Sequence, residues 1–223
     1  MSGRRWLISG TGTGVGKTTL GCALAAALRT RGLRVGVMKP AETGCSEEGG
    51  GLVAADAMML RAAAASSLAP ELICPYRYRS PLAPAAAAER DGLPAVNFGR
   101  LADSFEQIAA QSDCVLVEGA GGLAVPITWE SNYADLALAF RLELILVVAN
   151  RLGAINAAVL SLDYAASRAV ATRGYVINDI DPPRSEAALT NSASLARLCR
   201  APCLGTLGFE APLPRALADA LLL

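Results

Sequence analysis

The chain has 223 residues, of which 53% are hydrophobic and 18% charged, and its 20 basic side chains balance 20 acidic ones. This apolar content excludes an intrinsically disordered chain, and the balanced charge excludes a general basic field for nucleic acid. Histidine is absent. Nucleophilic catalysis with a histidine base and zinc held by histidine are therefore excluded as well.

The six cysteines show no Cys-x-x-Cys spacing, and several lie in apolar stretches. This pattern is typical of reduced thiols in the cytoplasm. The apolar run near the N-terminus is too short for a secretory signal, and no run reaches the roughly 20 residues of a membrane-spanning helix. We therefore expect a cytoplasmic protein with neither a membrane nor a nucleic acid as partner.

In chain order, continuous apolar runs predict strands at residues 4–10, 33–38, 114–118, 142–149, 174–178 and 202–207. Helical spacing predicts helices at 18–31, 51–65, 132–140, 154–167, 184–200 and 214–223, and a further helix capped by Asn97 that ends near residue 111. Residues 42–51 hold four glycines and predict a loop; residues 74–88 hold three prolines and predict irregular or edge structure. The alternation predicts an α/β fold: a single doubly wound domain over residues 1–223, with a mostly parallel sheet covered by helices on both faces.

A glycine-rich segment, Gly10-Thr-Gly-Thr-Gly-Val-Gly-Lys17-Thr18-Thr19, lies between the first expected strand and the first expected helix. In that context its backbone N–H groups and the helix N-terminus can hold phosphate, Lys17 can reach the β- and γ-phosphates, and Thr18 can ligate Mg²⁺. The strict GxxxxGK[ST] pattern needs glycine at position 11, whereas the chain has Thr11 there and the glycine one step earlier. We predict a phosphate-binding loop of the P-loop NTPase type. The motif leaves hydrolase, kinase and ligase open.

Two further residues stand at the expected carboxyl ends of strands, where ligands of open α/β sheets bind. Glu118 ends an apolar strand and is followed by Gly-Ala-Gly-Gly, so its carboxylate can hold Mg²⁺ beside a triphosphate. Lys17 and Lys39 are the only lysines, whereas eighteen basic residues are arginine. This bias indicates that both positions need a compact ammonium, and Lys39 can stabilise a transferring phosphoryl group or an anionic acceptor. Asp56 is a second candidate carboxylate, but its spacing alone does not distinguish it from a solvated helix residue.

Five motifs together, GTGTGVGKT, MKPAETG, VLVEGAGGLAVPI, ANRLGAIN and GYVIND, resemble those of dethiobiotin synthetases over residues 4 to about 210. The resemblance implies an ATP- and Mg²⁺-dependent cyclo-ligase of biotin biosynthesis that forms C–N bonds. Its substrates would be 7,8-diaminopelargonate, CO₂ and ATP, and its products dethiobiotin, ADP and phosphate. The implied intermediates are a carbamate and a mixed carbamic–phosphoric anhydride.

The resemblance also implies a role for individual residues. Catalysis would use Lys39, Lys17 and Thr13. Substrate would be bound by Thr13, Lys39, Thr43, Gly153, Ala154, Ile155 and Asn156, the last four holding the substrate carboxylate across a homodimer interface. Thr18, Asp56 and Glu118 would hold the metal. The nucleotide would be bound by Gly14, Val15, Gly16, Lys17, Thr18, Thr19, Asp56, Glu118, Gly119, Ala120, Gly121, Asn178, Asp179, Leu207, Gly208 and Phe209.

The chain departs from the family pattern at several positions. Gly12 and Gly14 stand where acidic residues are usual, Ala85 where histidine is common and Gly208 where proline is common. Three alternative functions stay open: another amido-ligase of the same superfamily, a P-loop ATPase switch of the ParA/MinD type, and a GTPase. The last alternative rests on Asn178-Asp-Ile-Asp181, which has the N-x-x-D spacing that reads guanine.

Overall fold

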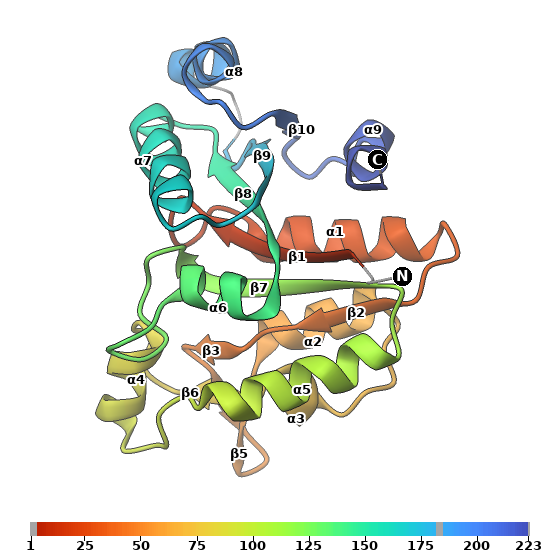
Figure 1. The fold of residues 1–223 in the computed structure, drawn as a ribbon, viewed down its shortest axis with the longest axis vertical. Helices are drawn as coiled ribbons and strands as arrows, with labels where there is room; N and C mark the ends of the chain where they lie inside the picture. The colour runs from red at the N-terminus through yellow and green to blue at the C-terminus, as the bar shows by residue number, and fades with distance from the viewer. Residues whose placement is uncertain (1–3, 182–184, 223) are drawn as a thin grey trace.

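The centre of the computed structural model, which describes residues 4–181 and 185–222, is a sheet of six strands in the order β10-β9-β8-β1-β7-β2 (Figure 1). Every neighbouring pair of these strands is parallel. The strands are β1 (Arg4–Gly10), β2 (Val35–Met38), β7 (Cys114–Gly122), β8 (Glu143–Ala149), β9 (Thr172–Asn178) and β10 (Cys203–Leu207). The expected α/β fold with a parallel sheet is confirmed.

Helices cover both faces of this sheet. They are α1 (Lys17–Arg29), α2 (Ala55–Ala63), α3 (Pro70–Ile73), α4 (Pro84–Asp91), α5 (Phe98–Ala110), α6 (Tyr133–Phe140), α7 (Ala154–Ser167), α8 (Glu186–Leu198) and α9 (Arg215–Leu222). Side chains of β1 alternate between two apolar clusters, as the pleat of a strand requires. Trp6 and Ile8 pack with residues of α1, α2 and α9, whereas Leu7 packs with residues of α5, α6 and α7.

The strand order places the ligand-binding crevice. From β1 the chain runs across the sheet to β2 on one side, whereas from the neighbouring β7 it runs to β8 on the other side, so the connections from these two adjacent strands go in opposite directions. In open α/β sheets, ligands bind beyond the carboxyl ends of the strands at such a switch point. The glycine-rich loop after β1 and the second half of β7 meet there. The strand expected to end at Glu118 continues to Gly122, so Glu118 lies inside β7 rather than at its end.

The structure corrects two expectations about the segment between β2 and α5 and agrees in part with a third, because the stretch expected to be irregular or edge structure contains an edge strand and also a helix. The expected loop at 42–51 contains short strands: β3 (Ala41–Thr43), and β4 (Ser46–Glu48) paired antiparallel with β5 (Gly51–Val53). The expected helix at 51–65 begins only at Ala55, because its first residues belong to that hairpin. The proline-rich stretch contains β6 (Tyr76–Tyr78), which pairs parallel with β3, and then α4. Of these elements, β3 and β6 form by backbone pairing between distant segments, which no local pattern reveals.

Several helix starts follow from local capping chemistry. Asn97 accepts a hydrogen bond from the Arg100 backbone N–H and begins α5 as expected. Asn132 forms a capping box with Asp135 at the start of α6. The expected helices at 184–200 and 214–223 correspond to α8 and α9, while Arg184 and Leu223 lie outside the described residues. Within the described ranges, no helix combines the length and apolar character needed to cross a bilayer.

Candidate active site

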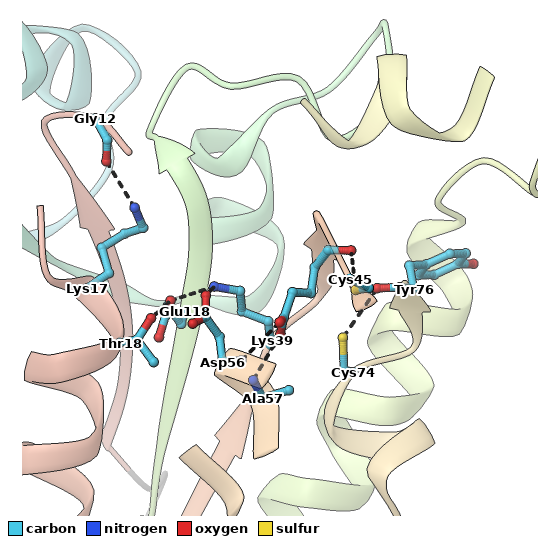
Figure 2. A network of polar contacts seen from close by, with 11 residues as sticks. Gly12, Lys17, Thr18, Lys39, Cys45, Asp56, Ala57, Cys74, Tyr76 and Glu118 are labelled. Carbon is cyan, nitrogen blue, oxygen red and sulfur yellow. Dashed lines mark hydrogen bonds and ion pairs between the residues drawn. The ribbon is translucent and has the colours of Figure 1, made fainter. Parts of the chain in front are cut away.

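The glycine-rich loop folds as a P-loop between β1 and α1, as predicted. Gly14 and Gly16 have φ values of 71° and 90°, a left-handed conformation that glycine adopts without strain. Glycine at position 14, where the family usually has an acidic residue, therefore suits the backbone. The ammonium of Lys17 donates to the Gly12 carbonyl at 3.0 Å (Figure 2). Burial, reinforced by the nearby Lys39 ammonium, lowers the pKa of Lys17 below its ordinary value.

A buried ionic cluster lies beside the P-loop, and Figure 2 shows its members pointing toward one another. Lys39 follows β2 directly, and its Nζ contacts Asp56 Oδ2 at 2.9 Å and Glu118 Oε1 at 2.5 Å. Thr18 Oγ1 donates to the same Glu118 oxygen at 2.9 Å. Side chains from α1, α2, β7 and the end of β2 therefore meet at one point.

Charge complementarity holds this cluster together. Lys39 is 3% exposed and Glu118 1%. Burial by itself lowers the pKa of Lys39, but the carboxylates of Glu118 and Asp56 outweigh it and raise that pKa above its ordinary value. Lys39 is therefore an ammonium at every physiological pH. The second carboxylate oxygen of Glu118, Oε2, is buried and has no hydrogen-bond partner.

A cavity of about 550 Å³ opens over the P-loop and this cluster. Of the predicted site residues, it brings together Thr13, Gly14, Gly16, Lys17, Thr18, Thr19, Lys39, Thr43, Asp56, Glu118, Ala120 and Gly121. These residues come from segments more than 100 positions apart in the sequence. The cavity is large enough for a small-molecule ligand.

The lining also includes residues that the sequence did not single out. Five of them form an apolar part of the lining: Pro81, Leu82, Ala83, Pro84 and Val125. The sixth, Glu42, is a buried carboxylate. Prolines indicated only irregular structure, and Glu42 lay unassigned inside the MKPAETG motif. Neither feature has a local signal that would relate it to the P-loop.

The residues predicted to contact the base lie beyond this lining. Asn178 ends β9, is buried, and donates through Nδ2 to the Val15 carbonyl at 2.9 Å, so it ties the sheet to the P-loop. Asp179 accepts from Asn150 Nδ2 at 2.6 Å, and its backbone N–H donates to the Leu207 carbonyl. Leu207 is buried at the end of β10; Gly208 and the exposed Phe209 follow it. The strand ends therefore bring these residues to the same edge as the P-loop.

Two other sets of predicted residues, Gly119 and residues 153–156, lie in β7 and at the start of α7. Gly119 is buried in β7 directly after Glu118, where a Cβ would come within 3.1 Å of the Tyr133 ring. Gly153 is the N-cap of α7 with a φ of 89°, and Ala154, Ile155 and Asn156 form the first turn of that helix. The latter group does not line the cavity of its own chain. Free backbone N–H groups at such a turn can bind an anion.

Comparisons with known proteins identify the family of the chain. A family model described as an AAA domain matches residues 4–211. The ATP-dependent dethiobiotin synthetase of Anaeromyxobacter sp. is 40% identical over 87% of this chain and 85% of its own. The corresponding enzyme of Thermodesulfovibrio yellowstonii is 36% identical over 92% of this chain and 88% of its own.

Solved structures are more distant and show the fold alone. The MinC:MinD complex of Aquifex aeolicus has a TM-score of 0.55 at 18% identity, over 97% of this chain and 86% of that one. The signal recognition particle receptor FtsY of Elizabethkingia anophelis has a TM-score of 0.51 at 16% identity, over 99% of this chain and 65% of that one. The sheet order and the P-loop are thus those of a P-loop nucleotide-binding fold, and by its close sequence relatives the chain belongs to the family of ATP-dependent dethiobiotin synthetases.

Proposed function

We propose that the chain is a dethiobiotin synthetase, which uses ATP to close a ureido ring on 7,8-diaminopelargonate with CO₂ and releases ADP and phosphate. The observation that carries this proposal is the cavity in which Lys17, from the start of α1, and Lys39, from the end of β2, accompany an apolar lining of proline, leucine and valine. The ammonium groups suit a triphosphate and an anionic acceptor. The apolar part suits an aliphatic chain.

The reaction proceeds in three steps. One substrate amine bonds to the carbon of CO₂ and loses a proton to solvent, which gives a carbamate. A carbamate oxygen then attacks the γ-phosphorus, and the bond from that phosphorus to the β–γ bridging oxygen breaks, so ADP leaves. The second amine attacks the carbonyl carbon, the bond from that carbon to the phosphate oxygen breaks, and the ring closes as phosphate and a proton leave.

The chain's residues supply charge and position for these steps. The carbamate and the γ-phosphate are both anions, so Lys17 and Lys39 offset their repulsion and stabilise the charge that develops on the transferring group. Thr13 and Thr43, which line the cavity, donate hydrogen bonds to substrate. Backbone amides of Gly14, Val15 and Gly16 bind the phosphates.

The residues fit a magnesium ion. Glu118 has a buried oxygen without a partner, and the Asp56 side chain is 42% exposed toward the cavity. The described residues contain no cluster of three or more carboxylate, thiol or imidazole groups, but Mg²⁺ needs only one or two carboxylates besides phosphate oxygens. We propose Thr18, Asp56 and Glu118 as its ligands. When bound, Mg²⁺ neutralises charge on the β- and γ-phosphate oxygens.

The adenine base is proposed to lie against Asn178, Asp179 and the 207–209 segment. The contact between Asn178 and the Val15 carbonyl supports this, because it holds the end of β9 next to the phosphate loop.

The substrate carboxylate is proposed to bind the α7 N-terminus of a second copy, so the active form is a homodimer. Exposed leucines near that turn, Leu152 at 87% and Leu160 at 61%, support a protein-covered surface. We also propose that the protein is located in the cytoplasm. The organisation of residues 1–223 as one domain stays a prediction.

The test incubates purified protein with diaminopelargonate, ¹³C-bicarbonate, ATP and Mg²⁺ and detects the ureido product by mass spectrometry. Labelled dethiobiotin in equal amount to released phosphate is expected, and Lys17→Met is expected to lose both. Phosphate without product would refute ring closure and indicate a different acceptor or a switch ATPase. Equal or faster turnover with GTP than with ATP would refute the proposed base.

A further inference from the structure

The first turn of α2, which carries Asp56, has no local cap. Its N-cap residue is Ala54, which has no side-chain oxygen to accept the exposed backbone N–H groups of the helix start. Glu42 accepts them instead. Its Oε1 accepts from the Asp56 backbone N–H and its Oε2 from the Ala57 backbone N–H, each at 2.9 Å. The cap therefore comes from β3, more than ten positions earlier in the chain.

Glu42 also belongs to the short segment that begins with Lys39. Lys39 binds the Asp56 carboxylate through its ammonium, and Glu42 binds the Asp56 backbone N–H. Asp56 is thus held at both its side chain and its main chain by residues three positions apart. Figure 2 shows Asp56 and Ala57 beside Lys39 and Glu118. A displacement of Glu42 would move the Asp56 carboxylate relative to Glu118.

The contacts of Glu42 indicate that it positions other groups rather than acting directly in the chemistry. Glu42 is 6% exposed, and each of its carboxylate oxygens accepts a backbone N–H. Both oxygens are thus engaged by the backbone of α2. The carboxylate is also placed at the positive end of a helix dipole, which favours a negative charge there. Burial, the largest influence, raises the pKa of Glu42, and the hydrogen bonds from Ala57 and Asp56 oppose that rise.

We propose that Glu42 is a positioning residue for the metal–nucleotide site: by capping α2 it orients Asp56 toward Glu118, and it thereby sets the affinity for Mg²⁺ together with ATP. This inference rests on the proposed ligand role of Asp56. Residues that orient metal ligands commonly change metal affinity or activity 10- to 100-fold when they are removed. We therefore expect a change of about that size in the Mg²⁺ concentration needed for half-maximal nucleotide binding.

The experiment measures binding of a non-hydrolysable ATP analogue by calorimetry over a Mg²⁺ series, for the wild type, Glu42→Ala and Glu42→Gln. Asn97→Ala is the matched control, because Asn97 caps α5 through one backbone N–H and does not line the cavity. Glu42→Ala is expected to raise the half-saturating Mg²⁺ concentration about 10- to 100-fold. Glu42→Gln keeps one acceptor oxygen and is expected to give an intermediate shift. Asn97→Ala is expected to lower the melting temperature and to leave the Mg²⁺ dependence within about twofold of wild type.

Two results would overturn the proposal. If both Glu42 variants lower the melting temperature but share the Mg²⁺ dependence of Asn97→Ala, Glu42 is an ordinary helix cap. If the half-saturating Mg²⁺ concentration for analogue binding is unchanged while a parallel assay with ATP shows phosphate release collapsing at every Mg²⁺ concentration, Glu42 acts in the chemical step. Because the binding series uses no diaminopelargonate, it decides the matter even for a chain that proves to make no ureido product.

Discussion

Replacement of Lys39 by methionine tests the ionic cluster most directly. The substitution keeps the length of the side chain and removes its ammonium, so the buried Glu118 carboxylate loses the cation that lies 2.5 Å away. Asp56 loses a partner as well, but its exposure allows water to replace much of that contact. The cost in the free protein therefore comes mainly from Glu118.

Removing one partner of a buried ion pair typically costs about 3–5 kcal/mol, because the other charge is left unpaired in the interior. For a chain of this size, each kcal/mol lowers the melting temperature by about 2–4 °C, so Lys39→Met is expected to melt about 6–20 °C below wild type. Millimolar Mg²⁺ is expected to restore more stability to this variant than to wild type, because a divalent cation then compensates both carboxylates without a competing ammonium. Product formation is expected to fall about 10²- to 10³-fold.

The assay is thermal denaturation followed by circular dichroism with and without Mg²⁺, combined with the ureido-product measurement. Lys39→Arg is the matched control, because it keeps the charge but replaces a compact ammonium with a planar fork. It is expected to lose less stability than Lys39→Met and still to lose most ring closure. If Lys39→Met has the melting temperature of wild type, the buried pair of Lys39 and Glu118 does not contribute to stability as the distances indicate. Near-normal turnover of Lys39→Arg would remove Lys39 from the catalytic residues.

Three further predictions concern the same edge of the sheet. Glu118→Gln is expected to raise the Mg²⁺ concentration for half-maximal activity, and an unchanged metal titration would leave Glu118 with a structural role. Gly16→Ala is expected to abolish nucleotide binding by calorimetry, because its φ is 90° and a Cβ would overlap the Asn178 side-chain amide. Gly12→Ala, where nothing lies within 4 Å of an added Cβ, is the control and is expected to bind normally. Because the pKa of Lys17 is lowered from 10.5, its charge is lost earlier as pH rises. ATP affinity is therefore expected to fall at a pH below 10.5, and an affinity that stays constant up to that pH would contradict this prediction.

Elements built from local signals were predictable from the sequence. The P-loop follows from glycine spacing between an apolar run and a helical pattern, and β1 and α7 have the expected bounds. α5 begins after Asn97 because a side-chain oxygen one position before the helix satisfies a backbone donor. In such cases the interacting groups lie within a few residues, so the local order of residue types is sufficient.

Apart from α2, which lies within the helix expected at 51–65, the segment from 41 to 91 could not be predicted in the same way. β3 exists because its backbone pairs with β6, more than 30 positions later, and the two strands are too short to show a strand pattern. The apolar lining at 81–84 and the cap that Glu42 provides for α2 are equally non-local. The residues that each of these features contacts are far away in the sequence, and only the folded chain brings them together.

The identities of the charged groups were determined by the sequence itself: two lysines beside eighteen arginines, Glu118 in an apolar strand, and motifs shared with one family. Only the tertiary structure decided which atoms meet. It brought the Lys39 ammonium between Asp56 and Glu118, directed the Asn178 amide to the P-loop, and left one Glu118 oxygen buried without a partner. The physical reason is that contacts between buried polar and charged groups depend on distances of a few ångströms between segments 17 to 163 positions apart. Such distances are set by the packing of the parallel sheet and its helices.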